Sequence, residues 1–190
     1  MKKKKSHLII SLMGVDGSGK TTLSKKLNLF FKSSTYLHLK PYILLKDKRT
    51  VVQDPHKQKK STKIVSLLRL LSWLVSYKVF FLQRKKKKIY IFDRYAHDIL
   101  IDPLRYKHNL SKNLTRFILN YFPEPDLWIF LKPSLKTIKS RKRELSDIEL
   151  KYQIKKYSIF FNNKKSVLML DTNNQSKILV KNIKKIISCL

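Results

Sequence analysis

The chain reads Gly14-Val15-Asp16-Gly17-Ser18-Gly19-Lys20-Thr21-Thr22 near its N-terminus, and no other residue of this 190-residue chain is glycine. This stretch fits the phosphate-binding pattern G-x-x-x-x-G-K-[ST]. Glycine lets such a loop turn with positive φ and approach a ligand closely, so that successive N–H groups point at a phosphate. A glycine turn that only caps an ordinary helix is the competing interpretation. A random match in a chain with this glycine content is expected on the order of once in a thousand chains.

Three groups in this loop have expected chemical roles. The backbone of residues 17–20 is expected to hold the β-phosphate of a nucleoside triphosphate, and Lys20 to bridge its β- and γ-oxygens. The Thr21 hydroxyl is the expected Mg²⁺ ligand, because Mg²⁺ keeps several waters and needs only one or two protein ligands. The predicted nucleotide-binding residues are Gly14, Asp16, Gly17, Ser18, Gly19, Lys20, Thr21 and Thr22.

Short apolar runs alternate with helical patterns on both sides of this loop. The expected strands are 8–13, 35–39, 89–92, 127–131 and 167–170, and the expected helices are 20–32, 62–83, 111–121, 134–142, 147–161 and 175–188. This alternation predicts a parallel α/β sheet covered on both faces, with ligands beyond the carboxyl ends of its strands. The pattern predicts a basic tail over 1–7, a proline-containing loop over 41–61 and one domain over 8–190.

A second candidate site is Asp93-Arg94, which ends the apolar run 89–92. A carboxylate at the end of a buried strand faces the same crevice as the glycine loop, so Asp93 is a candidate for the metal's ligand shell. Arg94 is able to fork onto a phosphate. The competing interpretation is an ordinary strand end at the surface.

A third candidate is the basic stretch Arg141-Lys-Arg143-Glu. Either arginine could close over a triphosphate and stabilise charge during transfer, as part of a lid over about 141–149. In a chain this basic, a solvated surface stretch is the strong alternative.

These motifs, in their order and spacing, resemble thymidylate kinases and their close relatives. The resemblance covers nearly the whole chain and includes Phe-Asp93-Arg94-Tyr and Pro-Asp126-Leu-Trp-Ile-Phe-Leu. It implies a P-loop kinase with a five-stranded parallel sheet, commonly dimeric, that transfers the γ-phosphoryl group of ATP to thymidine monophosphate. It also implies that Asp16 faces the acceptor, that Arg94 holds the acceptor's phosphate, and that Arg141 or Arg143 belongs to the lid.

The sequence departs from the family around the acceptor. The family's usual Glu-Pro-Gly-Gly-Thr segment is replaced by Lys40-Pro-Tyr-Ile-Leu, and the stretch after Asp-Arg-Tyr reads Ala96-His-Asp98-Ile-Leu-Ile-Asp102-Pro-Leu-Arg105-Tyr. A phosphate acceptor needs cations, for which Arg94, Arg105 and Arg69 are candidates. A nucleoside or sugar hydroxyl benefits from a base, for which Asp98 and Asp102, with Asp16, are candidates. The candidate acceptor residues are Asp16, Arg94, Asp98, Asp102 and Arg105. Both kinds of acceptor stay open at this level.

Composition bounds the partners. The formal charge of +31 suits a polyanion, but the lysines are spread along the whole chain, so biased residue usage is the favoured explanation, with non-specific attraction to polyanions at low salt. Cys189 is the single cysteine, which is compatible with a reducing cytoplasm. The apolar helix 62–83 is interrupted by charges and is expected in a core or a dimer interface rather than in a membrane.

Three functions follow from these observations. The leading one is Mg²⁺- and ATP-dependent phosphoryl transfer to a small acceptor, with a nucleoside monophosphate as the default. The alternatives are a kinase for a nucleoside or sugar hydroxyl and a non-catalytic protein that binds nucleotides or polyanions. The base preference of the phosphate donor stays open.

Overall fold

The structure is a computed structural model that describes residues 7–41, 59–83, 88–134, 137–138, 146–171 and 176–187. The described residues form two compact units. The first takes its residues from 1–37, 86–94 and 125–190, and the second from 38–85 and 95–124. Each unit is described by itself below.

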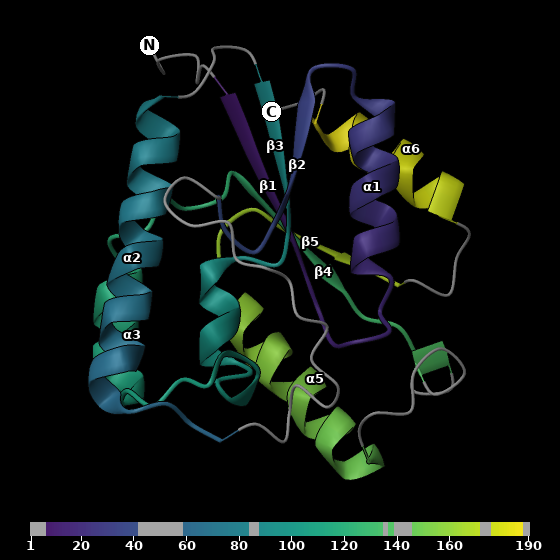
Figure 1. The fold of residues 1–190 in the computed structure, drawn as a ribbon. Helices are drawn as coiled ribbons and strands as arrows, with labels where there is room; N and C mark the ends of the chain where they lie inside the picture. The colour runs from purple at the N-terminus through teal and green to yellow at the C-terminus, as the bar shows by residue number, and fades with distance from the viewer. Residues whose placement is uncertain are drawn as a thin grey trace. The chain divides into compact units, whose positions relative to one another are not determined.

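The first unit is built on a parallel five-stranded sheet in the order β2-β3-β1-β4-β5 (Figure 1). The strands are β1 His7–Met13, β2 Ser34–His38, β3 Lys88–Asp93, β4 Leu127–Leu131 and β5 Val167–Leu170. The register pairs Leu12 of β1 with Asp93 of β3, and Met13 with Phe130 of β4. The carboxyl ends of the central strands therefore meet at one edge.

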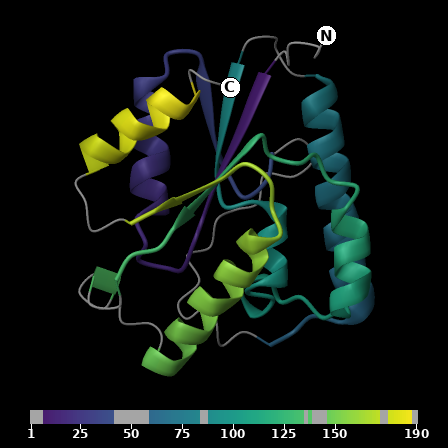
Figure 2. The same cartoon turned by 180° about the vertical axis from the view of Figure 1, so that it is seen from behind.

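Helices cover both faces of this sheet. Helices α1 (Lys20–Phe30) and α6 (Ser176–Ile187) lie side by side against one face in both views (Figures 1 and 2). Helix α5 (Asp147–Asn162) covers the other face, where Phe130 stacks on Tyr157 and Phe161. Every residue of β4 is buried, as expected of a strand that is covered on both sides.

The second unit contains helices α2 (Lys63–Leu82) and α3 (Lys112–Leu119) with two 3₁₀ helices, η2 (Ala96–Leu100) and η3 (Leu104–Tyr106). Its aromatic core centres on Tyr77, whose ring lies 4.8 Å from that of Tyr95 and 5.3 Å from that of Phe122. Fully burying an aromatic side chain contributes about 1.5–3 kcal/mol. These rings therefore contribute substantially to the stability of the described part of this unit.

Helix α2 has more apolar surface than its packing in the second unit buries. It buries Ser66, Leu70, Trp73, Ser76, Tyr77 and Phe81, and it exposes Ile64, Val65, Leu68, Leu71, Val75 and Leu82. Its length and mean hydropathy of 1.6 fit a membrane span, and 33% of the apolar window is buried. A core helix of a soluble protein passes the same test, so this feature is weak evidence for a membrane.

The predicted α/β sheet is confirmed, and the expected strands and helices lie within one or two residues of their predicted bounds where the structure describes them. The two 3₁₀ helices were not predicted, because runs of three to five residues leave no periodicity to detect. The expected tail over 1–7, the loop over 41–61 and the helix over 134–142 fall mostly outside the described residues.

Candidate functional site

The glycine loop joins the end of β1 to the start of α1. Gly17 and Gly19 have φ values of 78° and 88°, in the left-handed region that favours glycine. A Cβ atom on Gly14 would lie 2.6 Å from the carbonyl oxygen of Leu131, at the end of β4. Gly19 is the N-cap of α1 and offers no side chain to the first N–H groups of the helix. The loop is therefore a cradle of backbone atoms that packs closely against β4 at Gly14 and lies directly before the positive N-terminal end of α1.

The Lys20 ammonium group lies folded over this loop. Its Nζ atom donates to the carbonyl oxygen of Val15 at 2.7 Å and to the Ser18 hydroxyl at 3.3 Å, and it lies 3.9 Å from Oδ1 of Asp16. The residue is 5% exposed. A buried ammonium group beside the glycine loop and the first turn of a helix is suited to a polyphosphate anion.

Asp93 ends β3 and receives two hydroxyl groups on one carboxylate oxygen. Thr21, in the first turn of α1, donates to Oδ2 at 2.6 Å, and Tyr36, on β2, donates to the same atom at 3.2 Å. Asp93 is 1% exposed. Three segments that are far apart in the sequence thus meet at this carboxylate.

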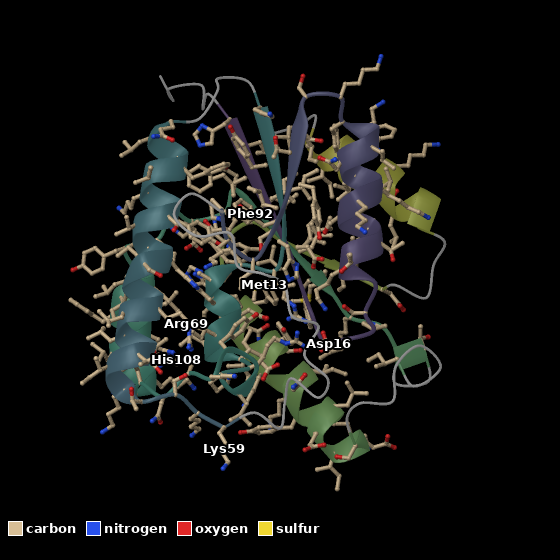
Figure 3. All side chains as sticks on the ribbon, in the orientation of Figure 1. Met13, Asp16, Lys59, Arg69, Phe92 and His108 are labelled. Carbon is tan, nitrogen blue, oxygen red and sulfur yellow. The ribbon has the colours of Figure 1, made fainter. Side chains whose placement is uncertain are left out.

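Arg94 follows directly and forms an ion pair with Asp16, through its Nη2 atom and Oδ1 of the carboxylate (Asp16 is labelled in Figure 3). Its backbone N–H donates to the carbonyl oxygen of Leu12 at 2.9 Å, which fixes it beside β1. Its φ is 73°, a strained value for a residue with a side chain, and such strain is concentrated at functional sites. The guanidinium group is thereby directed to the carboxylate of the glycine loop.

These residues fit a nucleoside triphosphate with Mg²⁺. The cradle suits phosphate oxygens, and the hydroxyl and carboxylate oxygens of Thr21 and Asp93 are the ligand type that Mg²⁺ prefers. Among the described residues no group of three or more His, Cys, Asp or Glu side chains could hold a metal by itself. A site with few protein ligands is typical of Mg²⁺ that is shared with substrate phosphates.

The predicted acceptor residues of the second unit form hydrogen bonds within the 96–106 segment. Asp98 is completely buried and accepts a hydrogen bond of 2.6 Å from the Tyr106 hydroxyl. Asp102 accepts from Arg105, at 3.2 Å from Nε and 3.3 Å from the backbone N–H. Both carboxylates therefore take part in the internal structure of the 96–106 segment.

Arg69, another arginine of the second unit, also has a structural role. It donates to the carbonyl oxygen of Tyr106 at 2.6 Å and to the Ser61 hydroxyl at 3.2 Å. These bonds fasten the end of η3 to α2. The predicted lid arginines Arg141 and Arg143, like Cys189, lie outside the described residues.

The contacts of two polar residues, Tyr36 and Asp126, are not predicted by the sequence. Tyr36 was not singled out, because a tyrosine in a short strand has no pattern that reveals where its hydroxyl lies. Asp126 belongs to the Pro-Asp-Leu-Trp motif, and its Oδ2 atom accepts from the backbone N–H of Ile9 at 2.8 Å. Asp126 therefore fastens the start of β4 to β1.

Comparison with known proteins finds a similar sequence and similar folds. No protein-family profile matches the chain. A probable thymidylate kinase from Sulfolobus acidocaldarius is 31% identical over 137 residues, which are 65% of this chain and 62% of the relative. The chain therefore matches less than two thirds of the length of this curated relative.

Solved structures match over almost the whole chain. Thymidylate kinase from Candida albicans superposes with a TM-score of 0.64 at 17% identity, covering 98% of this chain and 93% of the other. Deoxyadenosine kinase from M. mycoides with bound dCTP gives a TM-score of 0.65 at 18% identity, covering 96% and 100%. At such identities the likeness shows the fold alone, which this chain shares with these two kinases.

Proposed function

We propose that this chain, which has the fold and the motifs of the thymidylate kinase-like P-loop kinases, transfers the γ-phosphoryl group of ATP to a nucleoside monophosphate. Thymidine monophosphate is the default acceptor. The observation that carries the proposal is the convergence of Lys20, Thr21, Asp93 and Arg94 at the carboxyl ends of β1 and β3. A glycine turn that merely caps a helix gives no reason for a buried carboxylate and arginine from 70 residues away to meet it.

Phosphoryl transfer needs positioning and charge stabilisation more than covalent chemistry by the protein. In the proposed reaction the Lys20 ammonium leaves the carbonyl of Val15 and holds the β- and γ-oxygens of ATP. Thr21 and Asp93 are the residues that would hold Mg²⁺, which would supply neutralisation of the phosphate charge. Arg94 orients the acceptor's phosphate, an oxygen of which forms the new P–O bond as the bond to ADP breaks. Arg141 or Arg143 is the proposed lid cation.

The acceptor is proposed to be a phosphate rather than a hydroxyl. A hydroxyl acceptor calls for an accessible carboxylate base. Asp98 is completely buried against Tyr106, and the Asp102 carboxylate is engaged by Arg105. The Asp16 carboxylate is paired with Arg94. A phosphate acceptor is already nucleophilic and needs a cation such as Arg94 rather than a base, so this pair supports a phosphate acceptor.

We further propose that the chain forms a homodimer through the exposed face of α2. Ile64, Leu68, Leu71 and Val75 recur at intervals of four, three and four residues, so they lie on one side of the helix. Light scattering after size exclusion tests this proposal, with Leu68→Lys expected to give monomers and Lys25→Ala to leave the dimer intact. A wild-type monomer at micromolar concentration contradicts it.

A cytoplasmic location and weak, salt-sensitive attraction to polyanions complete the proposal.

The deciding experiment measures ADP release with Mg²⁺-ATP and a panel of nucleoside monophosphates, nucleosides and sugars. Lys20→Met keeps the aliphatic volume but removes the charge, so turnover should fall on the order of 100- to 1000-fold. The matched control is Lys25→Met, one turn further along α1 on its exposed side. Equal turnover in wild type and Lys20→Met would contradict the proposal, and stimulation only by nucleosides or sugars would replace the acceptor.

A further inference from the structure

The Tyr36 hydroxyl joins β2, at one edge of the sheet, to the carboxylate that ends β3. It donates to Oδ2 of Asp93 at 3.2 Å, and Thr21 donates to the same oxygen at 2.6 Å. The order β2-β3-β1 places β2 beside β3, so the tyrosine reaches the carboxylate from the neighbouring strand. None of the motifs identified in the sequence includes this tyrosine.

Two donors on one oxygen have a physical consequence for the carboxylate. The terminal torsion of an aspartate side chain is broad, so hydrogen bonds rather than rotamer preference set its plane. The Thr21 bond comes from α1 and the Tyr36 bond from β2, so the plane is held from two directions. Groups that orient a metal ligand in this way commonly change metal affinity by 10- to 100-fold when removed.

The direction of donation also matters for Thr21. Its single proton points to Asp93, which leaves the lone pairs of the hydroxyl oxygen for a cation. If the carboxylate plane turned, Thr21 would lose its proton acceptor and with it this orientation. A second donor on Oδ2 stabilises the plane that keeps Thr21 in place.

We propose that Tyr36 is a positioning residue for Mg²⁺, acting through Asp93 and Thr21. This inference rests on the proposed function, because it takes Mg²⁺-nucleotide as the ligand of the site. Tyr36 sets the affinity for the metal without touching the phosphates.

The test measures binding of a fluorescent ADP analogue over a range of Mg²⁺ concentrations and in EDTA. Tyr36→Phe keeps the ring and removes the hydroxyl, so the Mg²⁺ concentration for half-maximal binding should rise about tenfold. Binding in EDTA should match wild type. The control is Tyr90→Phe on β3, three residues before Asp93 and therefore on the opposite side of the strand. It should leave the Mg²⁺ requirement unchanged.

A double-variant cycle separates positioning from a general effect on the fold. In an Asp93→Asn background, Tyr36→Phe should add little, because its effect passes through the carboxylate. An unchanged Mg²⁺ requirement in Tyr36→Phe, or the same tenfold rise in both backgrounds, overturns the inference. If wild type shows no Mg²⁺-dependent nucleotide binding at all, the proposed function fails as well, so the two failures are distinguishable.

Discussion

The glycine-loop region and the 96–106 segment both contain a buried aspartate and an arginine paired with an aspartate, but these partners come from different distances along the chain. Asp16 pairs with Arg94, and Asp93 with Thr21 and Tyr36, across 57 to 78 residues. Asp98 and Asp102 pair with residues eight and three positions away. Local pairs shape a segment, whereas pairs across the sheet assemble a site. The difference favours the glycine-loop region as the place of the proposed phosphoryl transfer.

The largest expected effect separates two arginines. Arg94→Lys should lower turnover on the order of 100-fold, because lysine has no planar fork for a phosphate and a carboxylate. Arg105→Lys should change turnover by less than about threefold, since its pair with Asp102 is local. Initial rates of ADP release at saturating ATP measure both. Equal losses in the two variants would erase the distinction between the regions.

An intermediate effect is expected for Asp98→Asn, and it concerns stability. The buried carboxylate accepts from Tyr106, and weakening such a bond should cost about 1–3 kcal/mol of the free energy of unfolding. Turnover of the folded variant should stay close to wild type. Urea unfolding and ADP release measure the two quantities. A large loss of turnover with unchanged unfolding would instead identify Asp98 as a base and favour a hydroxyl acceptor.

The smallest expected effect depends on pH and belongs to His108 (labelled in Figure 3 together with Arg69). Burial, followed by the charge of Arg69, lowers the pKa of His108 from 6.5 to about 4. Thr115 gives its proton to the carbonyl oxygen of Ser111, so Nε2 of His108 is the donor at 2.7 Å to the Thr115 hydroxyl. Nδ1 is buried without a hydrogen-bond partner in the described part of the chain.

The unfolded chain takes up the His108 proton near pH 6.5, whereas the folded chain does so near pH 4. The unfolded state therefore binds more protons between these values, and the free energy of unfolding falls as the pH is lowered through this window. His108→Gln should flatten this dependence in urea titrations at pH 7 and pH 5. Parallel curves for wild type and variant would contradict the assignment.

The sequence was sufficient for the sheet and for the glycine loop, because both depend on local patterns. Apolar runs predict buried strands, and the spacing of Gly14, Gly19 and Lys20 predicts the cradle. Asp93 was predicted as a site residue from its place at a strand end. The roles of Tyr36 and Asp98 were not predictable, because each depends on where a hydroxyl from another element comes to lie. The lid arginines stay a prediction.

Helix α2 exposes the apolar side chains of Ile64, Val65, Leu68, Leu71 and Val75, in a chain of net charge +31. At low ionic strength, mutual repulsion keeps such molecules apart. The Debye length, over which charges are screened, shortens from about 30 Å at 0.01 M salt to about 3 Å at 1 M. Added salt therefore removes the repulsion while it strengthens apolar contact. We therefore expect the solubility of the protein to fall as salt is raised, the opposite of salting-in, with clear solutions in dilute buffer and turbid solutions at high salt.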